Sequence, residues 1–366
     1  MLPTGTRIAF DRNMIFPRYV IDAPTPTNIF VVNPSEPGGE LQLTMNDRSQ
    51  YPIWSPDGSR IAFIHLDEGV GSRNKRNPAS EIIVIDADGK NPKRLASFQS
   101  FLGANLSWSS DGKTLAIGGV MRASPEVLYR DAEQSIYLLE LDSKGTPRLL
   151  VRHGSFPSWS PDNSQIVYTC SSEVRLGEYR ASVCVIPVVI NPEPRVLAEN
   201  AWNPIWSPSG ENIAYLSRPE GKRQLVTLHP DGSDMVPITD GTRDVQSFAW
   251  SPDGRRIAYT EEHPMEDEVI QSGPLRSVDV PRIFVTKLDG TRIGPLGERD
   301  RLRCHDLSWS PDGEFIAAIC VSGLRDKTTR KQRFEASLFL LESANLKSKP
   351  RIIAQNGVER AVFAPR

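Results

Sequence analysis

Short β-rich apolar runs, separated by tight-turn residues, follow one another along the chain, and no stretch carries a long apolar period of 3.6 residues. One motif recurs among them: an aromatic residue, then Ser-Pro-Asp-Gly, then a new apolar run. Pro presets φ, Asp bonds nearby backbone amides and Gly accepts a positive φ, so the motif predicts a hairpin between two strands. Six copies of the motif, some with one substitution, begin at Trp54, Trp108, Trp159, Trp206, Trp250 and Trp309.

These copies are spaced 54, 51, 47, 44 and 59 residues apart, which is typical of propeller blades. After the motif strand come a second apolar run with its own turn, as in residues 81–89 and 282–290, and a last short apolar segment. Each repeat therefore predicts four antiparallel strands, the blade of a β-propeller. Because one blade cannot bury both of its faces, each motif aromatic is expected between adjacent blades.

A seventh copy is divided between the two ends of the chain. Phe363-Ala-Pro aligns with Trp-Ser-Pro, while Gly5 and Ile8 align with the equivalent residues of the other copies. We therefore predict an all-β fold: a seven-bladed propeller in one domain, with four antiparallel strands per blade. The closing blade would combine residues 1–46 with 357–366, and the other blades would start near residues 50, 104, 155, 203, 246 and 305.

The repeated Trp-Ser-Pro-Asp-Gly resembles the repeat of the TolB-like propellers, which are related to WD repeats, and the resemblance covers essentially the whole chain. It implies that the strand ending in the motif aromatic is the innermost strand of its blade. It also implies closure by the C-terminal strand, which would pair with the N-terminal strands. The resemblance leaves the function open, because such propellers occur in scaffolds, in accessory domains of proteases and in a few lyases.

Charge and hydropathy exclude some classes of function. The chain has 43 Lys and Arg against 45 Asp and Glu, a formal net charge of -2, so it lacks the positive field that nucleic-acid binding needs. No run approaches 18 apolar residues, so we expect no membrane insertion. The first residues have no charged leader and no apolar core, so no signal peptide is expected in this chain.

The predicted strand directions sort the loops onto two faces. The short motif turns share one face, here called the short-turn face, and longer, divergent loops share the opposite, long-loop face. Irregular loops on a rigid scaffold are where function usually lies, so we expect contacts there. On this face, Glu261 and Glu262 would be the first residues of an acidic loop. A neighbouring group of basic loop residues, here called the basic sector, would bind a protein or an anion. The alternative is ordinary solvated loop charge. The basic candidates are Arg73, Arg76, Arg325, Lys327, Arg330 and Lys331.

A second candidate region is the mouth of the central channel, lined by residues just before each innermost strand. Trp202 is the one Trp outside the motif, and beside Asn203 it could stack on a sugar or a peptide side chain. The alternative is that Trp202 packs on the neighbouring blade. The candidate binding residues at this mouth are His153, Trp202, Asn203, Gln246, Arg303, His305 and Arg360.

Tests for known chemistry are mostly negative. The chain has no GxSxG, P-loop, GxGxxG, HExxH or CxxC sequence, and we expect no metal and no cofactor. His65, His153, His263 and His305 could still converge on a metal at the channel mouth, as in oligogalacturonate lyases, which this chain resembles only in its repeat. That carbohydrate-active propeller is the alternative function, with sugar binding alone as a variant.

The four cysteines fall into two suggestive pairs. Cys170 and Cys184 flank one predicted hairpin, and Cys304 and Cys320 flank another, so both pairs could be cross-strand disulfides. The alternative is four small buried apolar residues. Disulfides would place the protein outside the cytoplasm. The family resemblance favours a periplasmic or secreted protein, and the missing leader favours the cytoplasm.

The sequence as a whole favours a non-catalytic, monomeric module. We expect it to bind another protein or an extended peptide through the long-loop face and the channel mouth.

Overall fold

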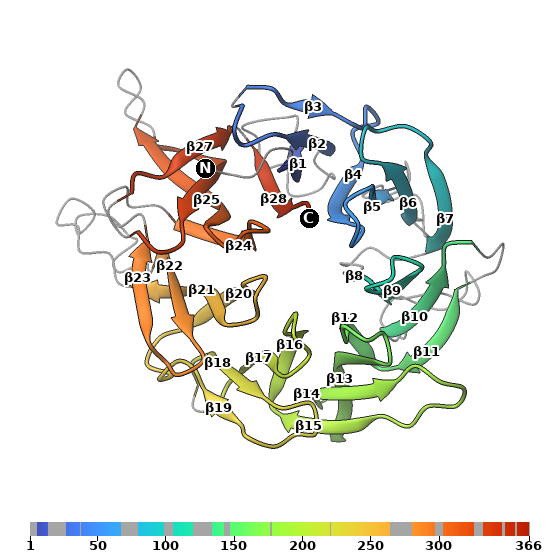
Figure 1. Ribbon diagram of the computed structural model, residues 1–366. Helices are drawn as coiled ribbons and strands as arrows, with labels where there is room; N and C mark the ends of the chain where they lie inside the picture. The colour runs from blue at the N-terminus through green and yellow to red at the C-terminus, as the bar shows by residue number, and fades with distance from the viewer. Residues whose placement is uncertain are drawn as a thin grey trace.

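The computed structural model describes residues 6–13, 27–36, 38–66, 80–98, 105–119, 134–142, 147–175, 178–219, 221–263, 280–296, 303–325, 332–345, 348–355 and 357–365. Within these residues the chain forms seven four-stranded antiparallel sheets arranged as blades around a centre (Figure 1). No helix among them is long and apolar enough to cross a membrane.

The blades are numbered here from the one that closes the ring, and each is given from its innermost strand outward. Blades 1 to 3 consist of β28 (Val358–Phe363), β1 (Ile8–Asn13), β2 (Thr27–Val32) and β3 (Leu41–Gln42); β4 (Ser49–Trp54), β5 (Arg60–Leu66), β6 (Ser80–Asp86) and β7 (Lys93–Phe98); and β8 (Asn105–Trp108), β9 (Thr114–Gly119), β10 (Ser135–Glu140) and β11 (Arg148–Arg152).

Blades 4 to 7 repeat this order. They consist of β12 (Gly154–Trp159), β13 (Gln165–Arg175), β14 (Glu178–Pro187) and β15 (Arg195–Glu199); β16 (Ala201–Trp206), β17 (Ile213–Ser217), β18 (Gln224–Leu228) and β19 (Val236–Pro237); β20 (Val245–Trp250), β21 (Arg256–His263), β22 (Val280–Lys287) and β23 (Arg292–Leu296); and β24 (Arg303–Trp309), β25 (Phe315–Arg325), β26 (Gln332–Glu342) and β27 (Arg351–Ala354).

Blade 1 joins the two ends of the chain. The C-terminal strand β28 pairs with β1 in antiparallel register, with Phe363 opposite Ile8, and the pairing continues at Ala364, whose N–H donates to the carbonyl of Arg7 at 2.7 Å. Phe363 is buried in a cluster that also contains Phe10 from the N-terminal strand and Phe315 from blade 7. The predicted seven-bladed fold and its closure by the C-terminal strand are therefore confirmed.

The motif tryptophans lie between adjacent blades, as predicted. Trp54, for example, is 6% exposed and packs among Ala9 and Val31 of blade 1. Its indole Nε1 donates to the carbonyl of Val362, on the innermost strand of that preceding blade, at 3.1 Å. The same bond, to the residue before the preceding motif aromatic, is made by Trp159, Trp250 and Trp309. These four indoles thus link one blade to the next by a hydrogen bond, whereas Trp108 and Trp206 are buried without a partner for Nε1 among the described residues.

The motif turn is held by its serine and aspartate. In the first copy Ser55 Oγ donates to Asp57 Oδ1 at 2.6 Å and accepts from the backbone N–H of Arg60 at 2.9 Å. Asp57 also accepts from the backbone N–H of Ser59. The hydrogen bond from Ser55, followed by that from Ser59, lowers the pKa of Asp57 to about 2. The turn therefore closes through its own side chains.

Three blade junctions carry an arginine that the motif comparison passed over. Arg7, Arg60 and Arg256 each precede the buried isoleucine of strand two. Arg256 places its guanidinium carbon 4.8 Å from the Trp309 ring centroid, and its Nη2 donates to the carbonyl of Gly313 at 2.9 Å. Arg7 and Arg60 repeat both contacts with Trp54 and Trp108 and the glycines of their turns. At these three junctions, one arginine of a blade therefore contacts both the Trp and the Gly of the next blade's motif; we call this contact the arginine clamp.

We expect Arg256→Ala to lower the free energy of unfolding by about 2 kcal/mol, because it removes a cation–π contact and two hydrogen bonds. The second of these joins Arg256 Nη1 to Ser343 Oγ. Urea unfolding followed by tryptophan fluorescence measures the change. The adjacent Arg255 is exposed, so Arg255→Ala is a matched control with an expected change below about 0.5 kcal/mol. Equal losses in the two variants would contradict the role given to Arg256.

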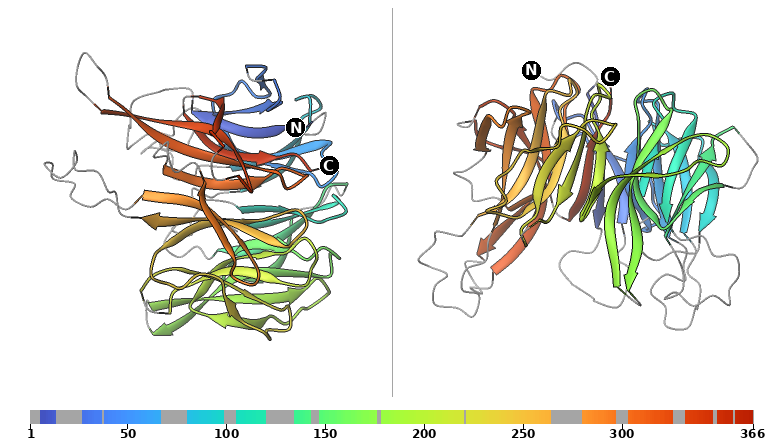
Figure 2. Two further views of the ribbon diagram at one scale, coloured as in Figure 1. Left: turned by 60° about the vertical axis from the view of Figure 1, so that its left-hand side comes forward. Right: turned by 90° about the horizontal axis from the view of Figure 1, so that it is seen from below.

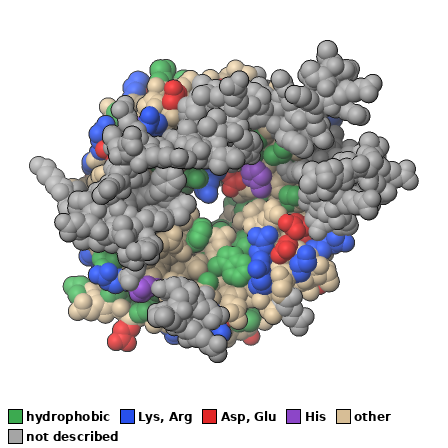
Figure 3. Space-filling view, turned by 180° about the vertical axis from the view of Figure 1, so that it is seen from behind, with side chains coloured by type: hydrophobic (Ala, Val, Ile, Leu, Met, Phe, Trp, Pro, Cys, Tyr) green, Lys and Arg blue, Asp and Glu red, His purple; other side chains and the backbone are tan. Residues whose placement is uncertain are grey.

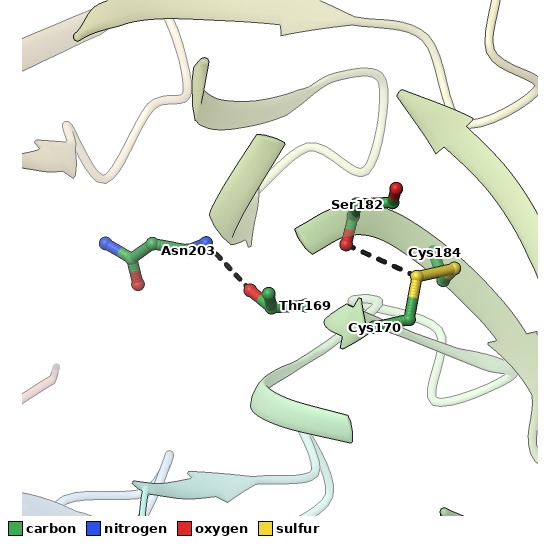
Figure 4. Close-up of a disulfide and its surroundings, with 5 residues drawn as sticks. All are labelled: Thr169, Cys170, Ser182, Cys184 and Asn203. Atoms are coloured by element: carbon green, nitrogen blue, oxygen red, sulfur yellow. Dashed lines mark hydrogen bonds between the residues drawn. A yellow bond between two sulfur atoms is a disulfide. The ribbon is translucent and has the colours of Figure 1, made fainter. Parts of the chain in front are cut away.

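Both cysteine pairs are bonded. Cys170 on β13 joins Cys184 on β14 with their Cα atoms 5.8 Å apart (Figure 4), and Cys304 on β24 joins Cys320 on β25 with Cα atoms 4.0 Å apart. The chain has no free cysteine. Of the two interpretations drawn from the sequence, the disulfides are the one the structure shows.

The two faces of the propeller differ in what projects from them. The β13–β14 hairpin extends beyond the other blades at the lower side of the right-hand view of Figure 2, and the C-terminus lies at the upper side. Because Phe363 and Ile8 are paired at the motif turn of blade 1, the upper side is the short-turn face. Figure 3 shows the long-loop face, which is hollowed at its centre.

Candidate functional site at the central opening

The innermost strand of each blade is hydrogen-bonded to strand two on one side only, so its other edge borders the central opening. On each innermost strand the motif aromatic is buried between blades, and in most blades so is the residue two positions before it. The residues one and three positions before the aromatic are half-buried or, in some blades, exposed. In six blades the pairing register shifts just before the motif. Side chains three residues before the motif aromatic therefore border the opening.

These seven side chains, here called the channel ring, differ strongly from blade to blade. Phe156 is 42% exposed although it is a large apolar residue on an innermost strand. Four members have a left-handed φ between 51° and 60° although none is glycine, which is uncommon and is found mostly at functional or tightly held positions. In blade order the ring consists of Arg360, Tyr51, Asn105, Phe156, Asn203, Ser247 and Asp306.

The backbone of the channel ring is held by polar side chains at one repeated position of strand two, three residues after its first buried isoleucine. Thr169 Oγ1 accepts from the N–H of Asn203 at 2.9 Å (Figure 4), and Thr260 Oγ1 accepts from the N–H of Ser247 at 3.1 Å. In Figure 4 the Asn203 amide points away from Thr169. These bonds satisfy backbone donors at an unpaired strand edge.

Asp11 occupies the same position in blade 1 and serves two blades. It is 1% exposed, and its two oxygens accept from the N–H of Arg360 at 2.7 Å and from the N–H of Tyr51 at 2.8 Å. Arg360 belongs to blade 1 and Tyr51 to blade 2, so one buried carboxylate joins the innermost strands on either side of the closure. Hydrogen bonds to a charged acceptor are the stronger kind.

The charged part of the channel ring lies at blades 7, 1 and 2. The Arg360 guanidinium carbon is 4.3 Å from the Tyr51 ring centroid. Burial raises the pKa of Asp306, an effect that Arg360 and His305 oppose. Burial also lowers the pKa of His305, which favours its neutral form. This side of the opening is polar and carries one exposed guanidinium, whereas blade 4 presents Phe156.

Five of the seven channel-mouth candidates predicted from the sequence lie at or beside the channel ring. Asn203 and Arg360 are members, and Trp202, Gln246 and His305 each stand one residue earlier on the same strands. Trp202 packs against the cluster between blades 5 and 6, which is the alternative that the sequence left open. Gln246 Nε2 donates to Glu262 Oε1 at 2.5 Å.

The remaining candidates lie away from this position or outside the described part of the chain. His153 stands in the turn before β12, where its carbonyl accepts from the N–H of Ser171. Arg303 lies on β24 and Arg325 on β25, and the structure describes only the backbone of these two residues. The basic-sector residues outside the described residues are Arg73, Arg76, Lys327, Arg330 and Lys331.

The predicted acidic loop is wrong at its first residues. Glu261 and Glu262 lie within β21, and Glu261 is 3% exposed. Its carboxylate is 3.3 Å from both Arg292 Nη1 and His263 Nε2, so it belongs to an internal ion-pair cluster. Among the described residues no three His, Cys, Asp or Glu side chains are grouped to hold a metal ion.

The sequence comparison missed Tyr51, Phe156 and Asp306. The available signal was their distance from the motif, since each precedes its motif Trp by three residues, as Asn203 precedes Trp206. Residue type gave no such signal, because the seven members share no chemistry.

The opening has a different character toward the short-turn face. A cavity of about 540 Å³ is lined there by motif tryptophans and by the prolines that follow them in the motif, among them Trp54, Pro56, Trp108, Pro252, Trp309 and Pro311. The residues one before the aromatic, such as Ile53 and Val362, complete this lining. The central opening therefore has a polar ring toward the long-loop face and an apolar cavity toward the short-turn face.

Solved structures similar to this chain include a propeller domain of a protease, a larger peptidase and a TolB protein. The propeller domain of the Trilobed protease from Pyrococcus furiosus is 16% identical, with a TM-score of 0.62 over 96% of this chain and 95% of that one. A puromycin-hydrolyzing peptidase from Mycobacterium tuberculosis is 15% identical, with a TM-score of 0.63, and this chain spans 54% of its length. TolB from Acinetobacter baumannii is 17% identical, with a TM-score of 0.52 over 85% of this chain and 68% of that one.

The predicted function, a non-catalytic interaction scaffold, is contradicted by these neighbours, because most of them are peptidases. The carbohydrate-active alternative falls with it, and the described histidines do not converge on a metal. The physical reason is that the repeat motif encodes packing between blades, which scaffolds and peptidase propellers share. The expected protein partner and the monomeric state stay predictions.

Nothing among the curated proteins matches this sequence. The sequence profile of the TolB beta propeller domain matches residues 4–273, which is most of the chain and includes the motif copies at Trp54, Trp108, Trp159, Trp206 and Trp250. Together with seven blades closed by the C-terminal strand, this match shows that the chain belongs to the TolB beta-propeller family.

Proposed function

We propose that this propeller is the substrate-admitting part of a peptidase, and that an extended peptide passes or rests in its central opening on the way to catalytic groups on another domain or chain. The observation that carries the proposal is the channel ring, which lines the opening with half-buried or exposed aromatic, amide and charged side chains at one level. The peptidases among the structural neighbours support the same reading, since this chain spans about half the length of several of them.

The chemistry of the channel ring suits an extended peptide. Such a peptide presents an N–H and a carbonyl at each residue, and the Asn203 amide and the Ser247 hydroxyl can both donate and accept. Phe156 and Tyr51 add apolar faces that can contact side chains of many kinds. A folded protein offers few free backbone groups, so this lining favours unfolded or short peptides.

The two disulfides support a periplasmic or extracellular location, because cross-links of this kind persist in oxidising compartments. A peptidase component in such a compartment would meet peptides outside the cytoplasm.

The proposal predicts that the chain, purified natively from its source cells together with what it is attached to or associated with, hydrolyses peptides. We expect Ser247→Trp, which narrows the opening, to slow cleavage of a 20-residue fluorogenic peptide roughly tenfold and to leave a tripeptide substrate nearly unaffected. The control is Ser233→Trp, in an exposed turn on the short-turn face. A preparation without peptide hydrolysis, or equal slowing of long and short substrates, would refute the proposal.

A further inference from the structure

The charged members of the channel ring are not equivalent to the others. Arg360 is exposed, and in the described part of the chain no carboxylate forms an ion pair with its guanidinium and no group accepts a hydrogen bond from it. The arginines that hold blades together, by contrast, donate to backbone carbonyls. Arg360 therefore keeps its donors available at the edge of the opening.

The position of Arg360 is fixed at both ends. Its backbone N–H is bonded to Asp11 Oδ1, and its guanidinium lies over the phenol ring of Tyr51. The Tyr51 N–H is bonded to the other oxygen of Asp11, so one buried carboxylate holds the backbones of the two residues whose side chains stack. A flexible arginine loses side-chain entropy when it binds, and this arrangement reduces that loss.

Asp11 lies beside Arg360 but directs both of its oxygens to backbone N–H groups. The neighbouring carboxyl, Asp306, accepts a hydrogen bond from the backbone N–H of Ala361, and burial raises its pKa. In the described part of the chain neither carboxyl accepts a hydrogen bond from the Arg360 guanidinium, whose donors therefore stay available to an incoming anion.

We infer that Arg360, stacked on Tyr51, is a binding site for the carboxylate of a peptide. A planar guanidinium presents two parallel N–H donors that match the two oxygens of a carboxylate. The inference rests on the proposed function in one respect, since it takes the ligand to be a peptide. The carboxylate can come from the peptide's free C-terminus or from an acidic side chain.

The test measures binding of three fluorescein-labelled hexapeptides of Ala and Leu to the purified chain by fluorescence anisotropy. One peptide has a free C-terminus, the second is its C-terminal amide, and the third is an amide that carries one Glu. The inference predicts that the free acid, the Glu peptide or both bind roughly tenfold more tightly than the plain amide, because a hydrogen-bonded charge pair is lost with the carboxylate. Whichever carboxylate peptide gains affinity identifies the source.

Arg360→Gln should abolish the preference for carboxylate, and Arg360→Lys should keep part of it, because lysine retains the charge without the planar fork. The matched control is Arg218→Gln, since Arg218 is another exposed arginine over an aromatic ring, 5.9 Å from the centroid of Trp202. That variant should bind all three peptides as the original chain does.

Equal binding of the three peptides to the unaltered chain would overturn the inference, as would equal effects of the Arg360 and Arg218 substitutions. The comparison of peptides on the unaltered chain does not depend on how any variant folds. If the natively purified protein hydrolysed peptides but the chain showed no preference for carboxylate peptides, only the Arg360 binding site would be refuted. An absence of hydrolysis would remove the proposed function, whatever the anisotropy shows.

Discussion

Deletion of residues 358–366 is expected to abolish cooperative folding of the whole chain. The deletion removes the innermost strand of blade 1, and with it Phe363, Val358 and Ala361 from the cluster between blades 7 and 1. Loss of one buried Phe side chain costs about 3–5 kcal/mol, and the free energy of unfolding of a whole domain is about 5–15 kcal/mol. Thermal unfolding followed by circular dichroism should show no sharp transition.

A control for this deletion moves the missing strand to the other end of the chain. Residues 358–366 would be placed before Met1 through a short Gly-Ser linker, so that the same strand can pair with β1. We expect this permuted chain to recover a sharp transition, because the strand's contacts do not depend on its order in the sequence. A deleted chain that melts as sharply as the full one would show that closure by β28 is dispensable.

The fold was predictable because its signals are local and repeated. Trp54 and its five equivalents recur with the same turn, and Phe363 with Gly5 and Ile8 supplies the missing seventh copy. A motif of this kind specifies a turn, a strand pair and a contact between blades at once, so each copy confirms the others. The arginine clamp was in the same sequence, before Ile8, Ile61 and Ile257, but its meaning depends on a contact with the next blade.

The site was less predictable, because its members are related by position and not by residue type. Asn203 and Arg360 were identified as polar residues before a strand, whereas Phe156 looked like an ordinary apolar strand residue until its 42% exposure was known. Asp11 lies within an apolar run, and nothing near it in the sequence indicates that its partners are Arg360 and Tyr51, 349 and 40 residues away. Contacts across the closure are long-range, and local patterns do not encode them.

Exposed charge was also overestimated from sequence. Arg12, on strand β1, is paired with Glu40 at 2.7 Å and lies over Phe10 and Phe30. Glu261 is paired in the same way, with Arg292 and Arg243. A charged residue near a loop is free to bind a partner only if the fold leaves it unpaired, and that depends on neighbouring strands. Arg360 meets this condition among the described residues.

Asp11→Ala is expected to lower the free energy of unfolding by roughly 3–5 kcal/mol, the second large effect. The substitution removes two hydrogen bonds to a charged acceptor, each contributing about 1.5–3 kcal/mol, and leaves the N–H groups of Tyr51 and Arg360 without their acceptor. Because these donors belong to different blades, the loss acts on the closure of the ring. Urea unfolding gives the change from the shift in midpoint at a constant slope.

The repeat supplies a graded control for Asp11, since Thr260 occupies the equivalent position and accepts from the N–H of Ser247. Thr260→Val removes a neutral acceptor with little change in shape, so we expect a loss of only about 1 kcal/mol. The loss of unfolding free energy in Asp11→Asn should lie between the losses of these two variants. The asparagine keeps one carbonyl oxygen as an acceptor, but its NH2 group is a donor that faces a backbone N–H. If Asp11→Ala were no more destabilising than Thr260→Val, the carboxylate would not be a link between the blades that close the ring, and the fixed position of Arg360 would need another cause.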